Sequence, residues 1–172
     1  MWITLVRQYI QIHFSLILSS PLNRTATTAL AIYNTVPGTK PTLLQDHRLI
    51  EQHMGSFEDQ PWSACRWQPD PTVNFRDQPF PGNGESSNQV LKRAISILQD
   101  LIQYQSNNSN ASVLVVSHGL FLTEFIHALC MLCRIAWVDV VCANTGVTTL
   151  ELTTQGSGWV MQAHEVNSTT HL

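Results

Sequence analysis

The sequence contains no run of about 18 consecutive apolar residues, the length that a membrane-spanning helix needs. Its first segment, MWITLVRQYIQIHF, is interrupted by polar side chains and has no basic stretch ahead of an apolar block, unlike a secretory signal peptide. Basic charge is also scarce, because nine Lys and Arg residues stand against twelve Asp and Glu residues, a net charge of −3. Surfaces for nucleic acid or anionic membranes normally carry an excess of basic residues. We therefore expect a cytoplasmic protein that has neither nucleic acid nor a membrane as its partner.

Cysteine is sparse, and the four cysteines do not have the spacing of a disulfide framework. His127, Cys130 and Cys133 lie three residues apart, which on a helix would place them on broadly one side and could form part of a metal site. The run around them is apolar, however, and no second pair of ligands accompanies them. Free cysteine is among the most buried residue types. We therefore interpret this segment as core packing and expect no metal site.

The pattern of apolar residues indicates an α/β protein with a single domain over residues 1–172. Short apolar, β-branched runs predict strands, and longer runs with apolar residues three or four apart predict helices. The expected strands cover 3–6, 15–20, 113–117, 145–152 and 158–166, and the expected helices cover 21–34, 86–104 and 120–133. Strands that alternate with helices favour an α/β fold with a mainly parallel sheet.

Two further segments carry specific expectations. Residues 113–117, VLVVS, are almost entirely apolar and β-branched, which is typical of a strand that is buried on both faces. Residues 62–85 are rich in proline and include Gly82 and Gly84. This composition predicts a long loop that forms a short cap over another part of the molecule, rather than a core element.

Charged and polar residues follow several of the expected strands, at the edge where α/β proteins bind their ligands. Arginine forks donate paired hydrogen bonds to phosphate oxygens, and a histidine at a helix N-terminus can bind the same anion. A carboxylic acid nearby can protonate a leaving alkoxide. Each residue taken alone could equally be structural, but together they predict a site for an anionic ligand of planar or tetrahedral shape. The residues in these positions are Arg7, Arg24, Glu51, His118 and Gly119.

Five motifs, in order along nearly the whole chain, resemble those of the histidine phosphatase superfamily, also called the phosphoglycerate-mutase-like family. They are SSPLNRTATTA, RLIEQHMGSFE, GNGESSNQVLKRA, VLVVSHG and NSTTHL. The resemblance is nearest to the branch of fructose-2,6-bisphosphatase-like phosphatases. It implies a three-layer α/β sandwich and hydrolysis of small phosphate monoesters, such as sugar phosphates or bisphosphates, through a phosphohistidine. It implies neither a cofactor nor a metal ion.

The same resemblance assigns roles to individual residues. Arg7 and Arg24 match the two arginines that hold the phosphoryl oxygens, and His118 matches the second histidine of the family site. Glu51 matches the proton donor, with Glu58 close enough to be an alternative. The resemblance further implies that substrate contacts come from Gly119, Glu85 and Ser86.

The stretch LVRQYIQIHFSLILSSPLNR, residues 5–24, departs from the family pattern. Where the family has His-Gly after its first arginine, followed by a crossover helix, this chain has Gln8 and Tyr9. About eight residues then connect the first two expected strands, which is fewer than the ten to twelve that a parallel crossover needs. The resemblance thus implies that this chain lacks the first crossover helix and the nucleophilic histidine.

Glutamine does not replace that histidine, because an amide nitrogen does not accept and release a phosphoryl group. His13 is the nearest histidine, but it lies at the far end of the connection from Arg7. We therefore expect a phosphatase whose activity is impaired. The alternatives are a non-catalytic phosphate-binding pseudoenzyme and a truncated variant without a function of its own.

Overall fold

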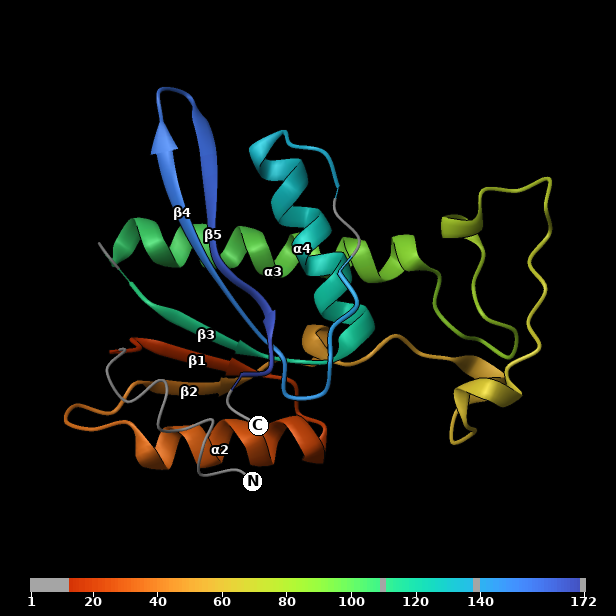
Figure 1. The fold of residues 1–172 in the computed structure, drawn as a ribbon, viewed down its shortest axis with the longest axis horizontal. Coiled ribbons are helices and arrows are strands. Elements are labelled where there is room, and N and C mark those ends of the chain that lie inside the picture. Colours follow the sequence, from red (N-terminus) through yellow and green to blue (C-terminus); the bar gives the residue numbers. More distant parts are fainter. Residues whose placement is uncertain (1–12, 109–110, 138–139, 171–172) are drawn as a thin grey trace.

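The described part of the fold is built around a parallel sheet of three strands (Figure 1). The computed structural model describes residues 13–108, 111–137 and 140–170. The strands are β1 (Leu16–Ser19), β2 (Thr42–Gln45) and β3 (Val113–Val116), in the order β2-β1-β3. All four residues of β1 are buried, as expected for the middle strand. The strand predicted at 3–6, and its connection to β1 up to residue 12, lie outside the described residues.

One face of the sheet is covered by α2 (Asn23–Thr35), which follows β1 directly. Because side chains alternate along a strand, Ile17 of β1 points toward this helix. Ile17 packs there with Ala29, Ile32 and Val36 in a small buried cluster. The helix starts after Pro21, so the helix predicted over 21–34 is confirmed within two residues at each end.

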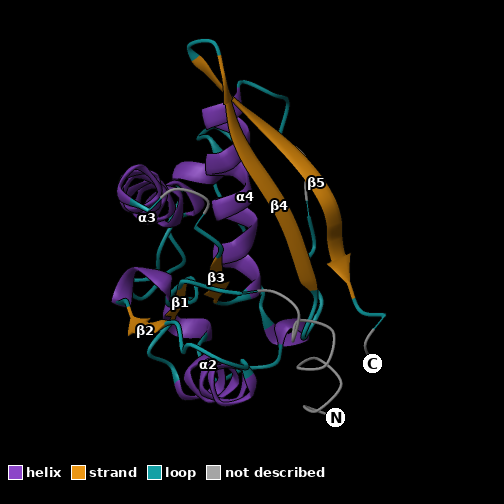
Figure 2. Ribbon diagram, turned by 90° about the vertical axis from the view of Figure 1, so that its left-hand side faces the viewer, coloured by secondary structure: helices purple, strands orange, loops and turns teal. Residues whose placement is uncertain are grey.

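The opposite face is covered by α3 (Ser87–Asn107) and α4 (Gly119–Cys133), as Figure 2 shows. The main core lies between these helices and the sheet, and it includes Leu18, Leu49 and Phe121. The sheet thus lies between α2 on one side and α3 and α4 on the other. The three-layer α/β sandwich with a parallel sheet is confirmed.

The expectation that the strand at 113–117 is buried on both faces is wrong. All four residues of β3 are only partly buried. Within the described residues β3 pairs with β1 alone. An apolar, β-branched composition therefore indicates a strand with hydrophobic neighbours, but it does not fix how many strands flank it.

The end of the chain forms an antiparallel hairpin of β4 (Val147–Gln155) and β5 (Gly158–Ser168). Gly156 has a φ of +59° in the turn, a backbone conformation that glycine adopts without steric cost. Leu150, Leu152 and Met161 of the hairpin pack against the main core. Both strands predicted at this end are confirmed.

The segment between β2 and α3 consists of loops and short 3₁₀ turns, located at His47–Leu49, Gly55–Phe57, Trp62–Ala64 and Phe75–Asp77. The proline-rich part extends away from the body in Figure 1. It has aromatic contacts of its own, since Trp67 lies 4.4 Å from Phe80 and 5.4 Å from Phe75 between ring centroids. Arg76 ties it to the body through an ion pair with Glu124 of α4. That residues 62–85 act as a cap stays a prediction.

Cys130 is buried on α4, as the core-packing interpretation expects. In the part of the chain that the structure describes, no group of three or more His, Cys, Asp and Glu side chains is arranged to hold a metal ion. None of the described helices is both long enough and apolar enough to cross a membrane.

Candidate active site

The polar residues that follow the strands meet at one edge of the sheet. The backbone N–H of Ser20 donates to the carbonyl of Val116 over 3.0 Å, and the N–H of Asp46 donates to the carbonyl of Ser19 over 2.9 Å. These bonds keep the carboxyl ends of β1, β2 and β3 level with one another. Arg24 and His118 follow the ends of two adjacent strands and are therefore brought together, although they lie 94 residues apart.

His118 is buried and held from both sides of its ring. The Nε–H of Arg24 donates to Nδ1 over 3.1 Å, and Nε2 lies 2.9 Å from the hydroxyl of Ser20. Because a guanidinium only donates, Nδ1 accepts, and the proton of the neutral ring is on Nε2 and is donated to Ser20. The ring orientation is therefore fixed by one hydrogen bond at each nitrogen.

The surroundings of His118 disfavour positive charge. Burial, followed by the nearby charges of Arg24 and Arg93, lowers the pKa of His118 to about 4 from an ordinary value of 6.5. The ring is therefore neutral at pH 7. His118 also stands at the N-cap of α4, where the helix dipole adds positive potential. Cationic groups and a helix N-terminus together make this edge of the sheet suitable for an anion.

Glu51 lies beside the same helix N-terminus. Its carboxylate accepts hydrogen bonds from the N–H groups of Phe121 over 3.1 Å and Leu120 over 3.3 Å, at the first turn of α4. It also accepts from the N–H of Gln52 over 2.9 Å. Gly119 stands next to it, because a Cβ atom built on this residue would lie 4.0 Å from Oε2 of Glu51. The structure thus places three of the predicted site residues, Glu51, His118 and Gly119, around the start of α4.

Glu85 and Ser86 occupy the entrance to α3 and have structural contacts there. The Ser86 hydroxyl accepts from the N–H of Gln89 in a capping box, and Ser86 is buried. Glu85 forms an ion pair with Arg93, and its carboxylate accepts the N–H of His53 over 3.0 Å. Although burial acts to raise the pKa of Glu85, the hydrogen bonds from Arg93 and His53 outweigh it and lower that pKa. Substrate binding by Glu85 and Ser86 stays a prediction.

The other predicted residues are less informative. Arg7 lies outside the described residues. The carboxylate of Glu58 accepts the N–H of Met54 over 2.6 Å within its own loop, so this alternative proton donor has a local structural partner. His13 is exposed, ahead of β1.

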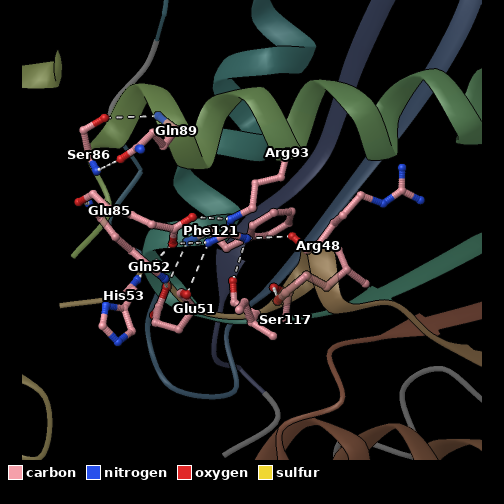
Figure 3. A network of polar contacts seen from close by, with 12 residues as sticks. Arg48, Glu51, Gln52, His53, Glu85, Ser86, Gln89, Arg93, Ser117 and Phe121 are labelled. Atoms are coloured by element: carbon pink, nitrogen blue, oxygen red, sulfur yellow. Dashed lines mark hydrogen bonds and ion pairs between the residues drawn. The ribbon is translucent and has the colours of Figure 1, made fainter. Parts of the chain in front are cut away.

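Sequence reasoning missed Arg93, which lies at the centre of the polar network drawn in Figure 3. Its guanidinium contacts the segment that carries Glu51 as well as Glu85. A signal was available in the sequence. Arg93 lies three residues after Val90 and four before Ile97, both of which are buried, so it is a charged residue on the apolar face of α3.

The fold and the site define a class of protein: a parallel α/β sandwich that brings an arginine, a histidine and a helix N-terminus together at the carboxyl edge of its sheet. The family model described as histidine phosphatase superfamily (branch 1) matches residues 3–167. The chain belongs to this superfamily. Placement in the fructose-2,6-bisphosphatase-like branch stays a prediction.

Individual relatives agree with the family. "Putative phosphoserine phosphatase 2" of Hydrogenobacter thermophilus is 30% identical over 157 residues, which cover 86% of this chain and 71% of that protein. The solved structure of a mycobacterial glucosyl-3-phosphoglycerate phosphatase with VO3 shares the fold with a TM-score of 0.73 at 18% identity, covering 98% of this chain and 83% of that one. A mutant phosphoserine phosphatase from Entamoeba histolytica, in complex with phosphoserine, has a TM-score of 0.66 at 24% identity and covers 99% of this chain and 82% of that one.

Proposed function

We propose that the chain binds small phosphate monoesters, sugar phosphates or bisphosphates among them, at the edge formed by Arg24 and His118, and that its phosphatase activity is impaired. The observation that carries this proposal is the buried His118 ring, fixed between Arg24 and Ser20 at the start of α4. The exposed, positively charged Arg24 lies beside the neutral His118 ring at the N-terminus of α4, and this combination favours an anion.

Arg24 is well placed to hold a phosphoryl group. Its bond to His118 uses Nε, so the two terminal nitrogens lie outside that bond. Arg24 is exposed, and its guanidinium can reach an anion that enters from solvent. A guanidinium fork that meets two phosphate oxygens forms charge-assisted hydrogen bonds, which are about twice as strong as neutral ones. The arriving negative charge also favours protonation of His118.

The chemical step itself is where we propose the impairment. In the phosphohistidine mechanism a histidine nitrogen attacks phosphorus, the ester oxygen leaves with a proton from an acid, and water then releases phosphate. Glu51 is in position to act as the acid, near Gly119 and His118. The nucleophile is the missing part, because Gln8 follows Arg7 where the family pattern has histidine.

The relative from Entamoeba histolytica supports binding without full catalytic machinery. That structure is a histidine-to-alanine mutant, and it is in complex with phosphoserine. For this chain, phosphoserine is therefore a suitable test ligand beside the sugar phosphates. Glucosyl-3-phosphoglycerate, named for the mycobacterial relative, belongs to the same chemical class of phosphate monoesters.

Calorimetry with inorganic phosphate and with phosphoserine tests the binding. Arg24→Ala should weaken phosphate binding about tenfold or more, because a hydrogen bond to a charged group contributes about 1.5–3 kcal/mol. Arg66→Ala is the matched control, since this exposed arginine contacts only its own loop through the carbonyl of Ser63 in the described structure. Equal phosphate affinities for wild type and Arg24→Ala would contradict the proposed site.

Single-turnover labelling with a phosphorylated substrate tests the impairment. We expect no stable phosphohistidine on this chain and slow or undetectable release of phosphate. A phosphohistidine that forms at the rate of turnover would overturn the impairment and establish an active phosphatase. If the chain binds phosphate without turnover, it is a phosphate-binding pseudoenzyme. A cooperative thermal transition of the purified chain would argue against a truncated variant of low stability.

A further inference from the structure

The guanidinium of Arg93 uses all of its hydrogen-bond donors within the protein. Nε donates to Glu85 over 2.8 Å, and one Nη2 proton goes to the same carboxylate over 2.8 Å. Nη1 donates to the carbonyls of Arg48 over 2.6 Å and Ile50 over 2.9 Å, and Nη2 donates to the carbonyl of Glu51 over 3.2 Å. A guanidinium has five N–H donors, so none is left for a ligand.

The three carbonyls belong to a segment that has no regular secondary structure of its own. A 3₁₀ turn ends at Leu49, and residues 51–54 that follow are neither helix nor strand. Backbone carbonyls in such a segment have no helix or sheet partner, so they need donors from elsewhere. Arg93 supplies these donors from the helix α3. Its hydrogen bonds hold the backbone from Arg48 to Glu51 in place against this helix.

Arg93 also contacts Phe121, which lies in the first turn of α4. Its guanidinium carbon lies 5.2 Å from the ring centroid of Phe121, over the ring face. The N–H of Phe121 in turn donates to the carboxylate of Glu51. Figure 3 shows Arg93 between α3, the Glu51 segment and Phe121. One guanidinium therefore fixes both the backbone of Glu51 and the helix end on which its carboxylate rests.

We infer that Arg93 is a positioning residue, which holds the Glu51 carboxylate at the start of α4 beside the phosphate site and does not bind the substrate itself. The inference rests on the proposed function for its link to phosphate chemistry. Glu85 follows as the partner that neutralises and orients Arg93. Lysine does not replace arginine here, because an ammonium has three donors without the planar fork.

The test is amide hydrogen exchange followed by NMR in Arg93→Lys. The amides of Leu120 and Phe121 donate to the Glu51 carboxylate, so they report whether it remains in place. We expect both to exchange about tenfold faster or more in the variant, after correction for global stability with the core amide of Ile97, because local opening is then easier.

Arg48→Lys is the matched control. The Arg48 side chain also joins α3 to this segment, but through Asp46, Ser96 and Asp100, with no contact to Glu51 in the described structure. This variant should leave the exchange of the two reporter amides unchanged. Equal exchange in Arg93→Lys and wild type, or the same acceleration in Arg48→Lys, would overturn the positioning role.

A phosphate titration separates this inference from the proposed function. The Nε–H resonance of Arg24 should move as phosphate binds, whereas the Nε–H resonance of Arg93 should stay in place. A shift at Arg93 that matches the binding curve would show that it is a ligand of the anion, and this would overturn the inference. If neither resonance moves, the phosphate site is wrong, while the exchange result still decides whether Arg93 positions Glu51.

Discussion

His118 depends on its neighbours for its charge state. Nothing in the sequence around it, VLVVSHG, distinguishes a histidine that is charged at pH 7 from one that is neutral. Burial and the cationic side chains of Arg24 and Arg93 decide this, and all three come from packing. Under the proposed function, a bound phosphate would change this environment, so the charge state of His118 and phosphate binding would be linked.

A pH dependence of stability follows from this environment. The pKa of His118 is about 4 in the folded chain and 6.5 ordinarily, so between these values the unfolded chain binds the proton and the folded chain does not. Stability contributed by this group is therefore present above pH 6.5 and is lost as the pH falls toward 4.

Urea denaturation across this range checks the prediction. The free energy of unfolding should fall more steeply with decreasing pH in wild type than in His118→Gln, which has no titrating group at this position. Parallel curves for the two proteins would contradict the depressed pKa. Saturating phosphate should flatten the wild-type curve, because a bound anion favours the protonated ring.

At the scale of elements, the two ends of α4 differ. N–H groups in its first turn have hydrogen-bond partners, whereas its last turn ends in a strained backbone conformation. Its first turn is capped by Glu51, which comes from a distant segment. Its last turn ends at Arg134, which has a φ of 54° and a ψ of 38° in the left-handed region. This conformation costs a residue with a Cβ atom roughly 1–2 kcal/mol, and glycine usually fills the position.

Arg134→Gly should therefore stabilise the protein. We expect a gain of about 0.5–1 kcal/mol, because the relief of steric strain is partly offset by the larger entropy of glycine in the unfolded chain. Lys92→Gly, on the exposed side of α3, is the contrast and should destabilise by about 1 kcal/mol. Urea denaturation measures both changes. A loss of stability in Arg134→Gly would show that the Arg134 side chain has a stabilising contact that outweighs its strained backbone.

The elements also show where sequence patterns are reliable. The described helices α2, α3 and α4 and the hairpin lie where the apolar periodicity predicts them. The spacing of apolar residues indicates which side of an element faces the core. The prediction for the burial of β3 is wrong, because burial depends on all the elements that pack around a strand. Composition of one strand does not contain that information.

At the scale of the whole molecule, two separate hydrophobic clusters among the described residues hold the sheet between its helices. The larger one includes Leu49, which is fully buried and comes from a 3₁₀ turn between β2 and the Glu51 segment. The carbonyl of Leu49 accepts the hydroxyl of Ser117 over 2.7 Å, at the end of β3. Leu49 thus joins the main core to the backbone on which both Glu51 and His118 depend.

Leu49→Ala should destabilise the whole domain by about 2–5 kcal/mol, the usual cost of deleting a buried leucine side chain. Leu44→Ala in the neighbouring strand β2 is the matched control. Leu44 is 50% exposed whereas Leu49 is 0% exposed, so the control should change the free energy of unfolding by about 0.5 kcal/mol or less. Thermal or urea denaturation compares the two variants. Similar losses in both would mean that Leu49 does not anchor the core.

The sequence by itself determined the α/β class, the three described helices, the strands β1, β3, β4 and β5, and the positions of Arg24 and His118 after strands, whereas β2 was not among the expected strands. Apolar periodicity is a local property of the sequence, and the convergence of strand ends follows from the topology of an α/β sheet. Only the tertiary structure decided the tautomer and charge of His118, the capping of α4 by Glu51, and the central position of Arg93. They depend on contacts between residues that are distant in the sequence: Arg93 and Glu51 are 42 residues apart, and Phe121 and Glu51 are 70 residues apart. Such partners are selected by the packing of whole elements, since a side chain finds its hydrogen-bond acceptor only after the backbones that carry both are in place.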